Sequence, residues 1–162
     1  MNKLKSILVL LMIIVCVIGL TISRNKNLND EILNQTTGLE TKVVLYFSNP
    51  ENGELTKEYR NVELSSVKND LAGTIMQELL KGPNTEGLVS AIPSGTKVNS
   101  CKEENDKIKI DFSSEYIGGG KQNELEELHK IYAVVNSLTE ITEINEVEIT
   151  VDGKILTSKI RL

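Results

Sequence analysis

The two most reactive side-chain types in the body of the chain are one thiol and one imidazole, Cys101 and His129. A catalytic thiol needs an activating base, and a metal site built on imidazole needs further ligands. The other cysteine, Cys16, lies in an apolar N-terminal run, so no disulfide can form within the body. Because free cysteines mostly pack as small core residues, we expect Cys101 to be structural and His129 to lie at the edge of an apolar helix face.

A glycine run, Gly118–Lys121, precedes a predicted helix and invites comparison with phosphate-binding loops. The pattern fails at two positions. Glu115 stands where the first glycine belongs, and Gln122 replaces the Ser or Thr that would hold magnesium. We therefore predict a flexible connection here and no nucleotide site.

Acidic residues form two further candidate groups. Glu103, Glu104 and Asp106 could supply oxygen ligands to calcium, but their spacing matches no calcium loop, so we expect a solvated turn. Asp111 and Glu115 could in principle flank a glycosidic bond, although nothing in the sequence places them in a groove. No serine lies in a G-x-S-x-G motif, while a triad scattered along the chain stays open.

These comparisons predict that the protein is not an enzyme, with no catalytic, cofactor-binding or metal-binding residue. Aromatic residues make up 4% of the chain, with no Trp, which disfavours an aromatic platform for sugars or bases. The net charge is -5, and the first 27 residues carry four positive charges and no acid. The rest is therefore strongly acidic and should repel nucleic acid.

The elements that would position any site are organised around residues 66–112. Leu71, Ile75 and Leu79 recur at helical spacing, with a start near Ser65 or Ser66 and a stop at Gly82–Pro83. A loop then leads to a turn at residues 92–96 and to a strand in which Ile108, Ile110 and Phe112 alternate with polar residues. Residues 104–106 should form the turn of a hairpin.

The remaining segments complete a regular order. A strand at 42–48 should be covered on both faces and should turn at 49–53 into a polar edge strand at 55–64. One short turn is expected at 113–117. A second helix at 123–140 has an Asn123–Glu126 capping box and an apolar stripe made of Leu125, Leu128, Ile131, Tyr132, Val135 and Leu138. Asp152–Gly153 should join the last two strands.

This order, β-β-α-β-β-α-β-β, predicts an α+β fold. We expect a two-layer sandwich with two helices packed on one mixed, mostly antiparallel sheet.

Residues 6–23 carry no charge and would span roughly 27 Å as a helix, about the thickness of a bilayer core. Lys3 and Lys5 precede them, which favours a body outside the cytoplasm. We predict that residues 1–24 are a membrane anchor or signal segment, 25–41 a polar linker and 42–162 the folded domain. An uncleaved anchor is favoured, with a cleaved signal or lipidation at Cys16 as alternatives.

Several stretches of the body together resemble the GerMN domain family of GerM-like sporulation and spore-germination proteins. The resemblance spans about residues 42–156, and the matching segments are 79–83, 91–98, 108–113, 134–141 and 147–154. Members are often lipoproteins, whereas Val15–Cys16 is a poor lipid-attachment site. Ser137 also stands where the family often has Thr. The shared glycines and prolines shape turns, so the resemblance carries over no catalytic residue.

The resemblance implies an extracytoplasmic, membrane-tethered, non-enzymatic protein acting in sporulation or germination as an assembly or scaffold component. It implies partners that are further copies or other spore-channel or cell-envelope proteins. The unpaired amides of an edge strand can accept another strand, so we expect strand 55–64 to be a docking site. The alternative is an exported module that binds peptidoglycan or another ligand. A ring would require head-to-tail contacts between two different faces.

Overall fold

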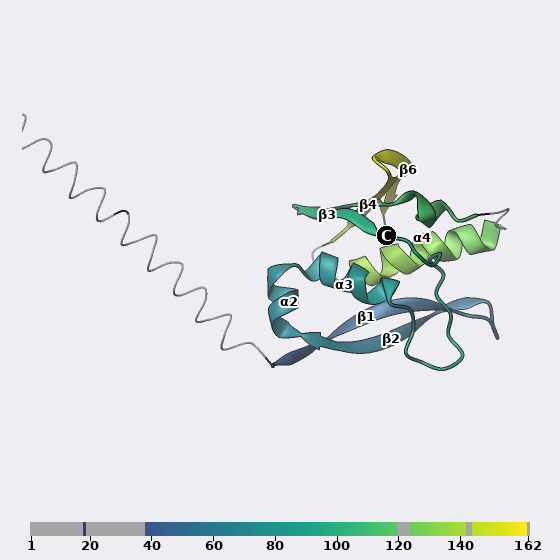
Figure 1. Ribbon diagram of the computed structural model, residues 1–162, viewed down its shortest axis with the longest axis horizontal. Helices are drawn as coiled ribbons and strands as arrows, with labels where there is room; N and C mark the ends of the chain where they lie inside the picture. The colour runs from purple at the N-terminus through teal and green to yellow at the C-terminus, as the bar shows by residue number, and fades with distance from the viewer. Residues whose placement is uncertain (1–17, 19–37, 120–123, 142–143, 162) are drawn as a thin grey trace, which may run out of the picture. The chain divides into compact units, whose positions relative to one another are not determined.

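The structure is a computed structural model that describes residues 18, 38–119, 124–141 and 144–161 (Figure 1). The chain divides into two units, Met1–Leu39 and Glu40–Leu162. Of the predicted anchor and linker, only Ile18 and residues 38–41 are described. Glu40 and Thr41 already belong to the first strand, so the folded domain begins two residues before the predicted bound of 42. Among the residues that are described, no helix combines the length and hydrophobicity of a membrane span.

The second unit has the predicted α+β class and order of elements. Its strands and helices are β1 (Glu40–Asn49), β2 (Glu54–Glu63), α2 (Leu64–Asn69), α3 (Leu71–Leu80), β3 (Val98–Glu104), β4 (Lys107–Phe112), the 3-10 helix η1 (Ser114–Ile117), α4 (Glu124–Thr139), β5 (Glu146–Val151) and β6 (Lys154–Arg161). The prediction of one sheet is wrong in detail, because the strands form two. One is the β1–β2 hairpin, and the other has the order β3-β4-β5-β6.

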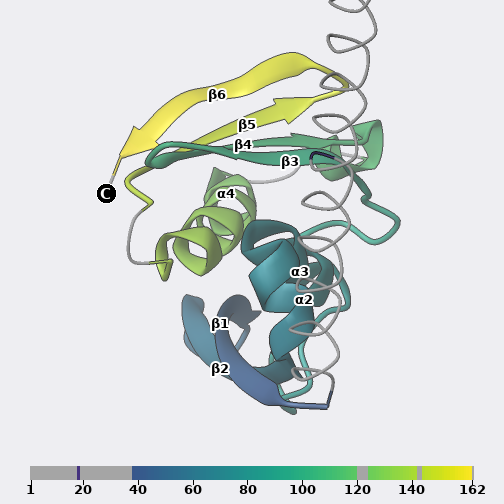
Figure 2. The same ribbon diagram turned by 90° about the vertical axis from the view of Figure 1, so that its left-hand side faces the viewer.

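The helices α3 and α4 lie between these two sheets (Figure 2). In the four-stranded sheet the central pair, β4 and β5, is parallel, while the outer pairs are antiparallel. The inward faces of β4 and β5 supply most of the core on this side, with Ile108, Ile110, Phe112, Val147 and Ile149 all buried. The alternation read from residues 107–112 is therefore confirmed.

The β1–β2 hairpin covers the opposite side of the helices. Val43, Leu45 and Phe47 are buried, whereas Val44 and Tyr46 on the other face are half-buried, so the strand is fully covered on one face only. The predicted turn at 49–53 closes the hairpin, with the Gly53 amide donating to the Asn49 carbonyl over 2.9 Å.

The first predicted helix is two helices. The chain breaks at Asp70, whose side chain accepts a 2.8 Å hydrogen bond from the Gly73 amide and so caps α3. The predicted cap at Ser65 or Ser66 is therefore wrong for the main helix. A β-carbon at Gly73 would lie 2.0 Å from an Asp70 carboxylate oxygen, so the cap requires glycine there. The predicted stop is confirmed, since Gly82 has φ +83°.

Helix α4 buries the second half of its predicted apolar stripe, Val135 and Leu138, but not the first half. Leu125, Leu128 and Tyr132 are exposed, whereas Lys130 and Ser137 are buried. The Lys130 ammonium is stabilised by the Glu127 carboxylate at 2.9 Å and lies 5.1 Å from the centroid of the Tyr116 ring. Asn123, the predicted cap, lies outside the described residues.

Candidate functional site

The structure places Cys101 and His129 on different elements, β3 and α4. Cys101 lies on β3, half-buried against the core, and burial, together with Asp70 and Glu103, raises its thiol pKa to about 11. The thiol is therefore protonated at neutral pH. His129 lies on α4 and bonds to β1, as described below.

The acidic residues have structural partners. The Glu104 carboxylate forms an ion pair with the Lys109 ammonium at 2.8 Å. Among the residues that the structure describes, no group of three or more His, Cys, Asp or Glu side chains could hold a metal ion. Asp111 accepts hydrogen bonds from the Thr150 hydroxyl and from the Gly153 amide at 2.8 Å. These bonds, the Thr150 bond first, lower the pKa of Asp111. Asp111 thus fixes the β5–β6 turn.

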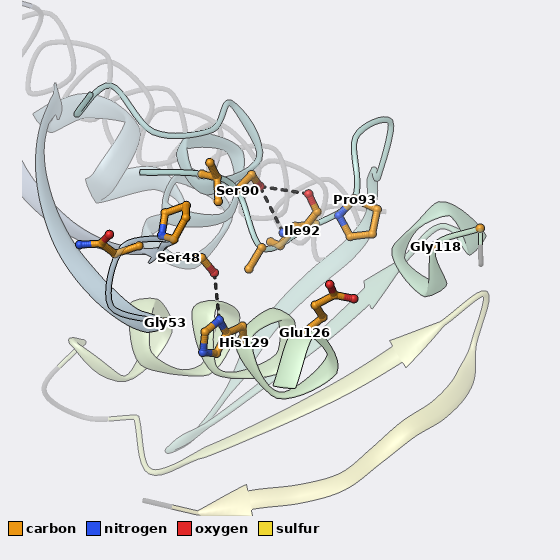
Figure 3. A pocket seen from close by; sticks show the side chains of 13 residues that line it. Ser48, Gly53, Ser90, Ile92, Pro93, Gly118, Glu126 and His129 are labelled. Atoms are coloured by element: carbon orange, nitrogen blue, oxygen red, sulfur yellow. Dashed lines mark hydrogen bonds between the residues drawn. The ribbon is translucent and has the colours of Figure 1, made fainter. Parts of the chain in front are cut away.

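A pocket of about 520 Å³ lies where the β1–β2 turn, the loop before β3 and the first half of α4 meet (Figure 3). Its walls are mostly small or apolar, and its polar side chains include Ser48, Glu126 and His129. Gly118 and Gly119 of the predicted glycine run also line it, while Gly120 and Lys121 lie outside the described residues. The full lining is Ser48, Asn49, Pro50, Gly53, Val89, Ser90, Ala91, Ile92, Pro93, Gly118, Gly119, Glu126 and His129.

One polar contact in this pocket joins Ser48 to His129, and another joins Ser90 to the Ile92 backbone. The Ser48 hydroxyl lies 3.2 Å from the imidazole Nδ1, and the contact links β1 to α4. A serine nucleophile needs a base that is itself held by an acid. Among the residues that the structure describes, the side chain that hydrogen-bonds to His129 is that of Ser48. Ser48 and His129 form part of the polar lining of the pocket. The sequence held no signal for it, because the two residues are 81 positions apart.

The second candidate site is the outer edge of β2. On β1, the outer edge is occupied: the Tyr46 amide donates to the Ser137 hydroxyl over 3.0 Å, and Ser48 exchanges two backbone hydrogen bonds with Val89. Backbone groups in an antiparallel pair alternate between the partner strand and the outer edge. The residues that face Ser48 and Tyr46 across the hairpin are Leu55 and Lys57. The same register makes Leu55, Lys57, Tyr59 and Asn61 present their N–H and C=O groups at the outer edge of β2.

This edge has few of the features that normally prevent strand addition. The ten-residue ladder from Glu40↔Glu63 to Asn49↔Glu54 is continuous, whereas the β3–β4 and β5–β6 pairs both contain register shifts. Bulges and prolines commonly block sheet edges, and β2 contains neither. In the part of the chain that the structure describes, no strand pairs with this edge. Tyr59, at its centre, is 66% exposed.

The inner face of β2 holds the hairpin to α3 through a buried ion pair. Arg60 contacts the Glu58 carboxylate and donates to the carbonyls of Glu78, at 2.7 Å, and Gly82, at 2.8 Å. Glu58 also accepts from the amides of Asn84 and Thr85. The pair thereby provides hydrogen-bond partners for backbone carbonyls at the C-terminal end of α3 and for backbone amides at the start of the following loop.

The ion pair predicts a stability that depends on pH. Burial opposes ionisation of Glu58, but the hydrogen bonds from Thr85, Arg60 and Asn84 outweigh it and lower the pKa below the ordinary 4.5. A carboxyl whose folded pKa is lowered stabilises the fold above its unfolded pKa, and this contribution is lost as the pH falls through the folded value. Glu58→Gln should therefore lower stability at pH 7 and reduce the loss below about pH 4.5. Urea unfolding from pH 3 to 7 measures the stability at neutral pH and its loss in acid. If the variant lost as much stability between pH 7 and pH 3 as the wild type, the prediction would be contradicted.

Comparison with known proteins places these features in a family. Residues 44–157 match the Germane family, described as "Sporulation and spore germination". No curated protein matches the chain. Solved structures match with low identity and show the fold, among them the following three. The first GerMN domain of the sporulation protein GerM from Bacillus subtilis is 22% identical, with a TM-score of 0.59, over 72% of this chain and 86% of that domain.

The other two structures extend this similarity. A putative lipoprotein from Clostridium perfringens is 20% identical, with a TM-score of 0.52, over 75% of this chain and 87% of that one. The tandem GerMN domains of Bacillus subtilis GerM are 22% identical, with a TM-score of 0.53, over 71% of this chain and 40% of the tandem chain. Since the family match covers most of the folded unit, this chain belongs to the Germane (GerMN) family of sporulation and spore-germination domains.

Proposed function

We propose that this protein is an extracytoplasmic, membrane-tethered, non-enzymatic component of sporulation or spore germination, and that it works by assembling with other proteins. The family match over residues 44–157 carries the proposal, because it associates the whole folded body with sporulation and germination. The uncharged segment 6–23 supports a tether, and one similar structure is described as a putative lipoprotein. The open β2 edge supplies a surface on which a partner strand can add.

The role in the cell is tested by deleting the gene in its spore-forming host and scoring spore formation and germination. We expect a defect that the full chain restores. Alkaline phosphatase, which needs disulfides that form outside the cytoplasm, should be active when fused to the C-terminus at the cell surface or in the intermembrane space of the sporulating cell. A fusion that is produced in full but inactive would contradict an extracytoplasmic location.

Complementation with a blocked edge tests how the protein acts. Asn61→Pro removes an N–H that we place on the outer edge of β2, so it should prevent strand addition and abolish complementation. Asn61→Ala is the matched control, because it loses the same 2.9 Å side-chain bond to Glu40 while keeping the N–H. Circular dichroism must show that both variants fold. Full activity of a folded Asn61→Pro variant would contradict docking at this edge.

The pocket supports a second candidate, an exported module that binds peptidoglycan or another cell-wall ligand. Its volume of about 520 Å³ lies within the range of small-molecule sites. Pull-down of a fragment beginning at residue 38 on purified peptidoglycan decides between the candidates. Saturable binding that Ala91→Trp abolishes by filling the pocket would favour the second candidate, and absence of such binding would favour the first.

A further inference from the structure

The outer edge of β2 has a charge pattern that is complementary to itself. Reading along the edge, the residues whose side chains lie on the solvent face are Leu55, Lys57, Tyr59, Asn61 and Glu63. A positive residue lies near one end and a negative residue at the other. Two copies of this strand running in opposite directions would therefore bring opposite charges together.

We propose that the β2 edge binds the β2 edge of a second copy of this chain, forming a two-fold dimer with a continuous antiparallel sheet of order β1-β2-β2-β1. In the register we propose, Lys57 lies opposite Glu63 of the second copy, and Tyr59 lies opposite Asn61. By symmetry each contact occurs twice. The inference rests on the proposed function only in taking this edge as the docking site.

The register follows from the backbone and from charge. Hydrogen-bonded partners across an antiparallel pair must both present their N–H and C=O groups to each other, and on β2 these are the odd-numbered residues. Among the pairings that this permits, the one centred on Arg60 gives two Lys57–Glu63 contacts. Opposite charges directly across strands stabilise a sheet, and like charges destabilise it. A register centred on Tyr59 would place Lys57 against Asn61 and leave Glu63 against Leu55.

The side chains on this edge are available for such contacts. Lys57 is 49% exposed although it pairs with Glu140, and Asn61 and Glu63 are exposed. Arg60 lies opposite itself across the two-fold axis, but its side chain points into its own core and is neutralised there by Glu58. Continuation of the sheet would also satisfy the outer backbone groups of β2, which no strand among the described residues pairs.

A two-fold contact of this kind closes on itself and uses one surface on each copy. It therefore predicts a dimer as the limiting species of the isolated domain. Any larger assembly would need a second, different surface.

Charge reversal tests the dimer. Residues 40–162 form one compact unit with its own core, so a fragment of residues 38–162 can be studied alone by sedimentation velocity. Lys57→Glu and Glu63→Lys should each weaken dimerisation by about tenfold or more, because each change creates two like-charge contacts. The double variant should restore the dissociation constant to within about threefold of the wild type. Glu140→Gln is the control, since it removes the partner of Lys57 within the chain and should leave the dimer intact.

Cysteine cross-linking tests the register. In a Cys101→Ser background, a mixture of the Tyr59→Cys and Asn61→Cys variants should form a disulfide-linked dimer, because opposed Cα atoms in a hydrogen-bonded pair lie about 5.5 Å apart. Cross-linking of Tyr59→Cys with itself in preference to the mixture would overturn the register. A wild-type fragment that stays monomeric up to its solubility limit would overturn the dimer. If Asn61→Pro then still failed to complement, the edge would bind another protein, and the proposed function would stand.

Discussion

Replacing Arg60 with methionine should lower the free energy of unfolding of the domain by about 3–5 kcal/mol. The substitution keeps an unbranched apolar stem but removes the guanidinium, so Glu58 stays buried, 5% exposed, without the charge that neutralises it. It also removes the donors to the Glu78 and Gly82 carbonyls at the end of α3. Urea unfolding at pH 7 followed by circular dichroism measures the change.

Arg60→Lys separates charge from geometry. A lysine keeps the positive charge, but its single ammonium cannot reproduce the planar fork that reaches a carboxylate and two carbonyls together. We expect Arg60→Lys to lower the free energy of unfolding, but by less than Arg60→Met does. A loss below about 1 kcal/mol for Arg60→Met would show that the buried pair contributes little.

Replacing Phe112 with alanine should cost about 3–5 kcal/mol in the free energy of unfolding. Phe112 has no exposed surface and stacks on Tyr116 with ring centroids 4.4 Å apart, so the truncation removes a core side chain and a ring contact. Thermal and urea unfolding both measure the effect.

The matched comparison for Phe112→Ala is Leu128→Ala on α4. Leu128 is 43% exposed, so its truncation should change stability by no more than about 0.5 kcal/mol. If instead Leu128→Ala cost as much as a core truncation, the exposed face assigned to α4 would be wrong. Phe112→Leu should fall between the two, since it refills part of the cavity.

The parts of the fold that follow from local pattern could be predicted. Alternation in β4 gave its buried face, and the turns at 49–53, 82–83 and 152–153 follow from Gly, Pro, Asn and Asp, whose backbone preferences act within a few residues. The break at Asp70 was missed because residues 66–80 read as one helix by apolar spacing. The Asp70 and Gly73 pair is a capping signal that the spacing concealed.

The errors of face and layer arise from tertiary partners. The sequence of β2 predicts a polar edge strand. In the structure Glu58 and Arg60 point inward and Tyr59 points outward. The charged side chains can be buried because the end of α3 supplies partners for them. In α4, Lys130 and Ser137 are buried because Glu127, Tyr116 and the β1 backbone satisfy them. The Ser48–His129 pocket joins segments that no periodicity connects.

The bonds from Ser137 and Val89 to β1 have a consequence for how the chain acquires its structure during translation. The hairpin leaves the ribosome first, but the hydroxyl that occupies one side of β1 belongs to α4, far along the chain. At synthesis rates of about 5–20 residues per second, the nascent hairpin spends several seconds with strand-pairing groups exposed on both flanks. In that interval the backbone groups on the outer edge of β1 are as open to strand addition as those of β2. Completion of α4 then covers the edge of β1 and leaves the edge of β2 open.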